Sequence, residues 1–242
     1  MNDDDAQLLS RVRSLREKGS GPKQIARALG LKPARASALV RQVAHEQQSA
    51  AAPTARPVVG CWVSAGWSTD LELSEAPDWA RADAEGAGDP EAAGFAQVLI
   101  ARRERASRIT VCGFLVDAYC LGVKDIVGPQ VMGGGSLDAF VRDYYRAFAR
   151  PPLPIGLEQA QSIVHGGVAY ARTLGFEPTP DLAQVSEHLG EPGPAAPRIG
   201  FGRQGQPFYI NGPRDDAQAV VSTLERTCGA GNYHYVLGTG PL

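Results

Sequence analysis

The stretch IARALGLKPARASALV, residues 25–40, decides the fold of the N-terminal part of the chain. Gly30 lies inside this stretch, and because glycine adopts the left-handed conformation freely it ends a helix without a steric clash. Apolar residues recur at helical spacing on both sides of this glycine. They are Ile25, Ala26, Leu29, Leu31, Ala36, Leu39, Val40 and Val43. The pattern predicts two short helices that meet at a tight turn at Gly30.

The preceding residues predict a further helix. Leu8, Val12 and Leu15 are spaced by four and then three residues, so they line one side of a helix. Pro22 suits the first turn of the next helix, where a backbone N–H has no intrahelical partner. The region 7–44 is therefore expected to form three helices that bury their apolar sides together.

This region resembles the helix-turn-helix DNA-binding superfamily, with residues 25–40 as the matching run. The resemblance implies that the last of the three helices enters the major groove of double-stranded DNA. Arg35 is the side chain suited to a bidentate contact with guanine, and most of the remaining polar positions suit phosphates. Lys32 stands where a capping Ser, Thr or Asp is favoured. Because only Arg35 can make a bidentate contact with a base, we expect modest sequence specificity. The candidate DNA-binding residues are Lys23, Arg27, Lys32, Arg35, Ser37 and Arg41.

The distribution of charge favours an anionic partner for the N-terminus. Residues 1–48 hold nine Lys and Arg against five Asp and Glu, whereas the rest of the chain holds 15 against 21. A local excess of positive charge attracts polyanions such as DNA. The same three helices would also suit a module for protein contacts, or a remnant tethered to an active domain.

The composition as a whole indicates a folded, cytoplasmic protein. Its 242 residues are 43% hydrophobic and carry a net charge of −2, which argues against a protein that coats nucleic acid with its whole surface. No apolar run reaches membrane-spanning length, and the acidic start MNDDD is unlike a signal peptide. The four cysteines lack the paired spacing of a zinc site, so we expect buried thiols, no metal and no cofactor.

Residues 46–57 are rich in Gln, Ser, Ala and Pro, which predicts a linker between a small all-α domain, 1–45, and a larger domain, 58–242. The larger domain alternates strand and helix patterns, so the expected fold class is α+β with a mainly antiparallel sheet. An acidic insert at 68–94 is expected to be a mobile loop. Strands are expected at 58–67, 95–103, 109–121 and 232–238, a hairpin at 198–210, and helices at 136–149, 157–175, 181–190 and 213–229.

Most of residues 58–238 is similar to a bacterial family of unknown activity. The matching segments are FLVDAYCLGVKD, GGVAYARTLGFEPTPD, FGRQGQPFYINGPRDD and GAGNYHYVLG. Because no activity comes with this resemblance, candidate chemistry must be taken from the residues themselves.

Asp117 is the most prominent of these residues, because it ends an otherwise apolar strand where an unpaired carboxylate would be costly. One interpretation is a catalytic site in which Asp125 and His165 support Asp117. The run DAYCLG also resembles the first active-site strand of ribonuclease H proteins, but that chemistry needs more carboxylates around two divalent ions. The other interpretation is a structural Asp117 that pairs with Lys124 or accepts backbone hydrogen bonds.

Two further features have structural explanations. Gly166 and Gly167 inside a helix cost about 1.5–2 kcal/mol relative to alanine, so a ligand or a packed element must approach that backbone closely. Asp215 and Asp216 follow Pro213 at the start of an expected helix, where capping and the helix dipole account for both.

The sequence therefore predicts a DNA-binding protein, a transcriptional regulator of modest specificity whose larger domain serves oligomerisation or effector sensing. A homodimer would present two recognition helices to half-sites about 34–36 Å apart. The alternative is a nucleic-acid-processing enzyme that uses the N-terminal domain as a DNA anchor.

Overall fold

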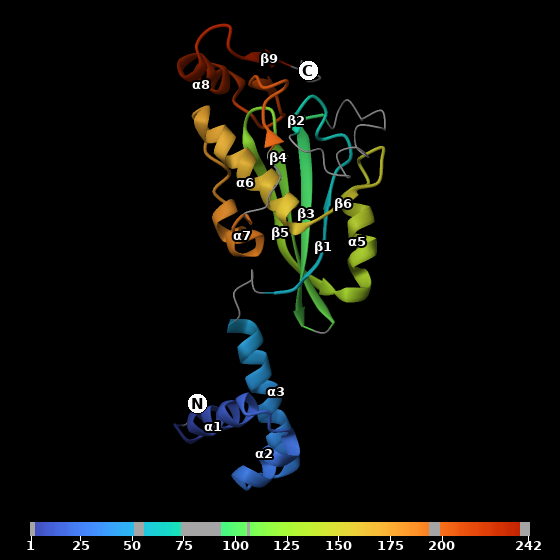
Figure 1. The fold of residues 1–242 in the computed structure, drawn as a ribbon, viewed down its shortest axis with the longest axis vertical. Coiled ribbons are helices and arrows are strands. Elements are labelled where there is room, and N and C mark those ends of the chain that lie inside the picture. Colours follow the sequence, from blue (N-terminus) through green and yellow to red (C-terminus); the bar gives the residue numbers. More distant parts are fainter. Residues whose placement is uncertain (1–2, 51–55, 74–92, 106, 194–198, 238–242) are drawn as a thin grey trace. The chain divides into compact units, whose positions relative to one another are not determined.

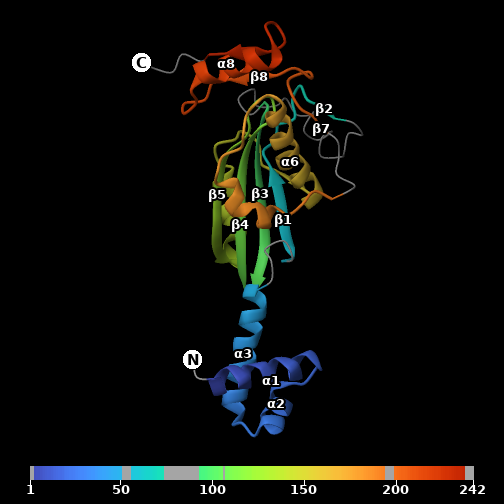
Figure 2. The ribbon, with the colours of Figure 1, turned by 90° about the vertical axis from the view of Figure 1, so that its left-hand side faces the viewer.

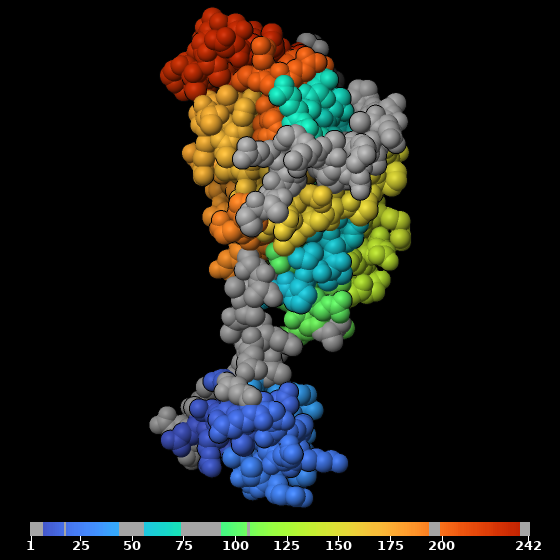
Figure 3. Space-filling model, in the orientation of Figure 1, coloured from blue at the N-terminus to red at the C-terminus, as the bar shows by residue number. Residues whose placement is uncertain are grey.

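A computed structural model describes residues 3–50, 56–73, 93–105, 107–193 and 199–237 (Figure 1). The chain divides into two compact units, Met1–Ala55 and Arg56–Leu242. Figure 3 shows the surface of each unit in the same colours. Among the described helices, none is long and apolar enough to cross a membrane.

The first unit is built from α1 (Asp3–Glu17), α2 (Pro22–Leu29) and α3 (Pro33–Ala50). Gly30 adopts the left-handed conformation, with φ 61°, and its N–H donates to the carbonyl of Ala26. The predicted helices and the turn between the second and third are confirmed. Their shared core consists of Leu9, Val12, Ile25, Leu39 and Val43, with Leu8, Leu15, Leu29, Leu31 and Val40 packed around it.

Helix α3 continues farther than expected, because it ends only at Ala50. Residues 46–50 of the expected linker are therefore helical. Glu, Gln and Ala favour helix, and this preference outweighs the low hydrophobicity that suggested a linker. Residues 51–55 lie outside the described part of the chain.

A five-stranded sheet forms the centre of the second unit, with strand order β5-β4-β3-β1-β6. All of its neighbouring pairs are antiparallel, which confirms the predicted α+β class. The hairpin between β3 and β4 closes through the pair Arg105 and Arg108. The strands are β1 (Val58–Val63), β3 (Phe95–Arg105), β4 (Arg108–Asp117), β5 (Gly122–Gly133) and β6 (Leu153–Ile155).

Helices cover both faces of this sheet, as the two views in Figures 1 and 2 show. On one face, α6 (Leu157–Thr173) and α7 (Leu182–Leu189) bury alternate residues of the strands, including Phe114 and Val116. On the other face, α5 (Leu137–Tyr144) packs on the intervening residues, such as Val111. A short 3-10 helix, η2 (Gly134–Ser136), precedes α5.

The C-terminal segments gather at one end of the sheet, where β4 ends (Figure 1). There β8 (Phe208–Ile210) and β9 (His234–Val236) form a parallel pair, and α8 (Ala217–Cys228) packs nearby. A small cluster of buried side chains joins them to the turn after β4. Its members are Cys120, Leu174, Tyr209 and Leu224.

The expected hairpin at 198–210 is wrong. β7 (Ile199–Gly200) pairs with β2 (Glu72–Leu73), and β8 pairs with β9, so only the bridge between Arg203 and Gln206 remains of the hairpin. The turn forms, but its flanking segments find partners elsewhere in the fold. Within the expected mobile loop at 68–94, residues 74–92 lie outside the described part of the chain.

Strand β5 was not expected from the sequence. Its residues GVKDIVGPQVMG lack regular alternation and include a proline. Because β5 is an edge strand of the sheet, a proline without an N–H is tolerated there. Ser136 precedes α5 as expected, but its side chain makes no capping hydrogen bond.

Candidate functional site

The candidate DNA-binding residues lie on α2, at the turn before α3, and on α3. Lys23, Arg27 and Lys32 are exposed, as are Arg35 and Arg41. The helices that carry them are held in place by the core of the unit, because Ile25 and Ala36 on the same helices are fully buried. Ser37 is half-buried, so it has less access to a partner than the basic residues have.

A shallow depression of about 290 Å³ lies on α2 and is lined by Lys23, Gln24, Arg27 and Ala28. Its two cationic side chains are four residues apart, so they project from the same side of the helix. Two neighbouring cations beside a shallow depression suit a phosphate group.

Lys32, the residue before α3, has no side-chain acceptor that could cap the helix. Its backbone carbonyl accepts hydrogen bonds from the N–H groups of Arg35, at 3.0 Å, and of Ala36, at 3.1 Å. The helix therefore begins without an acidic cap that would oppose an approaching phosphate.

Asp117 at the end of β4 holds the next turn of the chain. Its Oδ1 accepts hydrogen bonds from the backbone N–H groups of Tyr119 and Cys120, both at 3.0 Å. The carboxyl group is 1% exposed, and Oδ2 is buried without a hydrogen-bond partner. Burial raises the pKa of Asp117 to about 6, although Lys124 and the backbone donors lower it.

Asp125 and His165 have separate partners. Asp125 binds Arg214, with 2.8 Å between Oδ2 and the guanidinium, and His165 Nε2 lies 2.7 Å from the carbonyl oxygen of Gly190. His165 lies on α6, which packs on the face of the sheet that holds Val116, whereas Asp125 pairs across the strands with Leu115 on the opposite face. The structure does not bring Asp117, Asp125 and His165 together in one site. Among the described residues, no group of His, Cys, Asp and Glu is arranged to hold a metal ion.

Gly166 and Gly167 are explained by packing. A Cβ on Gly166 would lie 2.5 Å from the ring of Phe201, and one on Gly167 would lie 2.6 Å from Cγ1 of Val116. The close approach expected at these glycines is therefore made by an aromatic ring and by the sheet.

The buried cysteines offer no activated nucleophile. All four are free thiols, and Cys61, Cys112 and Cys120 are buried. Burial raises the pKa of Cys61 and of Cys112 to about 12, so both stay protonated and unreactive at neutral pH.

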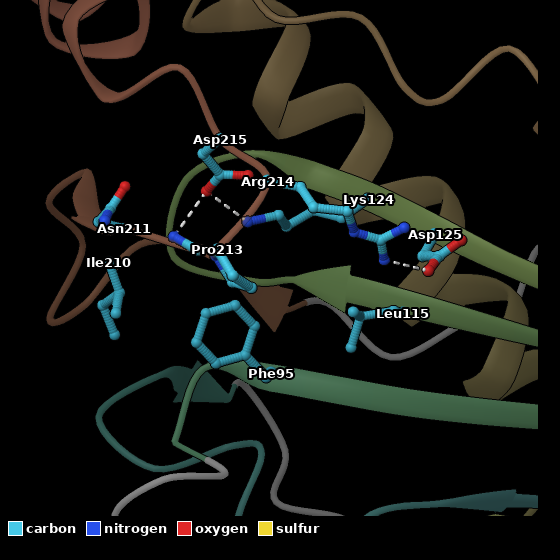
Figure 4. Close-up of a pocket in the computed structure, with 10 residues that line it drawn as sticks. Phe95, Leu115, Lys124, Asp125, Ile210, Asn211, Pro213, Arg214 and Asp215 are labelled. Carbon is cyan, nitrogen blue, oxygen red and sulfur yellow. Dashed lines mark hydrogen bonds and ion pairs between the residues drawn. The ribbon is translucent and has the colours of Figure 1, made fainter. Parts of the chain in front are cut away.

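A pocket of about 550 Å³ opens at the end of the sheet where β4 meets the C-terminal segments (Figure 4). Phe95 and Leu115 come from the first residues of β3 and the last of β4, and Lys124 and Asp125 come from β5. The opposite wall is the segment between β8 and α8. The complete lining is Phe95, Leu115, Lys124, Asp125, Ile210, Asn211, Gly212, Pro213, Arg214 and Asp215.

Two ion pairs cross this pocket, as the dashed lines and neighbouring sticks in Figure 4 show. Lys124 Nζ lies 2.7 Å from Asp215 Oδ2, and their side chains are only 17% and 11% exposed. Arg214 pairs with Asp125 nearer to solvent. Asp215 Oδ2 also accepts from the N–H of Gly212 at 2.9 Å and from the hydroxyl of Tyr209 at 3.4 Å.

Sequence reasoning gave Asp215 a different role. Asp216 alone caps α8, by accepting from the N–H of Ala219, whereas Asp215 turns to Lys124. The expectation that capping and the helix dipole explain both residues is therefore wrong for Asp215. The pair joins positions 91 residues apart, and no local pattern signals such a contact.

In comparisons with known proteins, no family model, curated protein or solved structure matches the chain.

Proposed function

We propose that the chain is a DNA-binding protein, a transcriptional regulator whose N-terminal unit binds double-stranded DNA with modest sequence specificity. The observation that carries this proposal is the set of exposed basic side chains on α2, at the turn and on α3. They stand on a unit whose own buried core orients them. The second unit then serves as an effector-sensing or oligomerising domain.

Most of these side chains suit phosphates better than bases. Arg35 lies in the first turn of α3, where residues of a recognition helix reach base edges. Its neighbours Ala34 and Ala38 offer no hydrogen-bonding groups for base recognition. Affinity therefore depends mainly on charge, and sequence preference depends mainly on one arginine.

The test is a titration of a fluorescent DNA duplex with the full chain. If four of the basic residues contact phosphates, the salt slope is about −3.6, and affinity falls roughly 10²-fold between about 50 and 200 mM salt. Lys23→Ala lowers that slope by about 0.9 and weakens all sequences equally. Arg35→Ala reduces the discrimination between sequences.

Arg11→Ala is the matched control, because Arg11 is an exposed arginine on α1, outside the proposed surface. Binding that is independent of salt, or equal losses for Arg11→Ala and Lys23→Ala, would contradict the proposed interface. Mg²⁺ is included in the titration, because cleavage of the duplex would favour the alternative of a nucleic-acid-processing enzyme. Light scattering on the same samples tests the homodimer that paired half-sites would require.

A further inference from the structure

The pocket at the end of the sheet combines two features that small-molecule sites share. Its volume of about 550 Å³ is suited to a small organic ligand. Apolar side chains line part of it, and a small number of charged groups converge on the rest (Figure 4). Such sites take ligands that have both an apolar body and charged groups.

The charges that line the pocket are balanced. Lys124 and Arg214 are cationic, and Asp125 and Asp215 are anionic. Asp117 lies beside them in the sheet, because its cross-strand partner is Phe95, and it is fully buried. A purely anionic ligand would face the two carboxylates of the lining, and a purely cationic one would face its two cations.

Both the basic and the acidic side chains of the pocket can form further hydrogen bonds. Lys124 has three N–H groups and Arg214 has five, and each makes one described ion pair. On the acidic side, Asp215 receives its described donors on Oδ2, which leaves Oδ1 for a ligand. Asp125 is less available, because Ile126 N–H occupies Oδ1 and Arg214 occupies Oδ2.

The spacing of the two inner charges sets the kind of ligand. In an α-amino acid, the ammonium and the carboxylate are attached to the same carbon, so a site for both needs a cation and an anion side by side. Lys124 Nζ and Asp215 Oδ2 are 2.7 Å apart and mostly buried. Arg214 stands beside them with a side chain that is 82% exposed and able to reposition.

We propose that this pocket binds a small apolar zwitterion of the α-amino-acid class. Lys124 and Arg214 hold its carboxylate, Asp215 Oδ1 holds its ammonium, and Phe95, Leu115 and Ile210 contact its hydrocarbon side chain. Binding itself is independent of DNA. The role of the ligand as an effector rests on the proposed DNA-binding function.

The experiment uses three probes that share one hydrocarbon body and differ in charge. L-phenylalanine carries both charges, phenethylamine lacks the carboxylate, and 3-phenylpropionate lacks the ammonium. Binding to the full chain is measured by ligand-observed NMR at concentrations up to about 10 mM, without DNA, and L-leucine tests a smaller body. We expect the amino acids to bind at least about tenfold more tightly than either analogue, since each analogue leaves one charged group of the pocket unmatched.

Arg214→Gln tests the location, with Arg226→Gln on α8 as a matched control at another exposed arginine. We expect Arg214→Gln to weaken binding about tenfold and Arg226→Gln to leave it unchanged. An analogue that binds as tightly as the amino acids, an absence of binding by both amino acids, or equal effects of the two variants would each overturn the proposal. Because DNA is absent, these outcomes are separate from those of the DNA titration.

Discussion

The buried carboxyl group of Asp117 makes the stability of the second unit depend on pH in a direction opposite to that of most acidic residues. Its pKa is raised from 3.8 to about 6 by burial, so the folded chain holds a proton that the unfolded chain has already released. Well below pH 3.8 both states are protonated and there is no effect. As pH rises from about 4 to above 6, the folded state loses stability relative to the unfolded state.

The size of this effect follows from the pKa difference. Each pKa unit corresponds to about 1.4 kcal/mol, so Asp117 costs about 3 kcal/mol at neutral pH compared with pH 3.5. Asp117→Asn removes the titration but keeps an oxygen for the N–H groups of Tyr119 and Cys120. We therefore expect the free energy of unfolding of the wild type to fall by about 3 kcal/mol relative to that of the variant between these two pH values.

Urea unfolding followed by tryptophan fluorescence measures this difference. All three tryptophans, Trp62, Trp67 and Trp79, lie in the second unit, and Trp67 is fully buried, so the signal in the full chain comes from that unit. Asp138→Asn makes the same chemical change at an exposed carboxylate on α5 and serves as the control. If the free energies of unfolding of the wild type and of Asp117→Asn depended on pH in the same way, the assignment of a buried carboxyl group with a raised pKa would be refuted.

Three further predictions use the same unfolding measurement. Gly122→Ala should destabilise the second unit by at least about 2 kcal/mol, because φ is +66° and a Cβ would lie 2.7 Å from the carbonyl oxygen of Gly167. Gly205→Ala has a similar φ of +77°, but its Cβ would lie 3.7 Å from Glu72 Oε1, so it should cost less. Equal losses for the two variants would contradict this packing. Burial lowers the pKa of His188 from 6.5 to about 4, so His188 stabilises the folded state above pH 6.5, and this stability is lost as pH falls toward 4. His188→Gln should abolish that loss. A pH profile of stability that the substitution leaves unchanged would show that His188 is not buried in its neutral form. Lys124→Met should lower the free energy of unfolding by about 1–3 kcal/mol, because it leaves Asp215 without its cation. Adding Asp215→Asn to the same chain should recover part of that loss. Additive losses from the two substitutions would show that the pair is not coupled.

The helices were the part of the fold that the sequence predicted best. Their signals are local, since apolar residues at a spacing of three and four reveal a buried side without knowledge of the partner. This holds for α2 and α6, each of which begins and ends within a few residues of its expected bounds. Helix α3 was also predicted, but it extends into the expected linker. The C-terminal end of α2 was predictable to the residue, because Gly30 has a specific conformational role there.

Strand pairing was harder to predict, because it depends on residues far apart in the chain. The turn at Gln204 and Gly205 has suitable local chemistry, with φ of 52° and 77°, but no local signal shows that β7 pairs with β2 and that β8 pairs with β9. The pocket could not be predicted from the sequence for the same reason, because its walls come from distant parts of the chain. Lys124 and Asp215 were each visible as charged residues, but their contact depends on how the C-terminal segment returns to the sheet.

The path of the C-terminal segment also explains how Asp117, a structural residue, influences the nearby pocket. Its carboxyl group accepts hydrogen bonds from the turn after β4 and so fixes the turn. Two carbonyl groups of the same turn accept hydrogen bonds from the C-terminal segment, Ala118 from the N–H of Gly202 and Tyr119 from the N–H of Phe208. β8 is fixed by these bonds, and β8 leads directly to the wall that carries Asp215. Asp117 is therefore a positioning residue, and its interpretation as a structural carboxylate accounts for both its burial and its bonds. If the turn sets the place of Asp215, then Asp117→Ala, which removes both turn bonds, should weaken binding of L-phenylalanine, and Asp117→Asn, which can keep them, should preserve it.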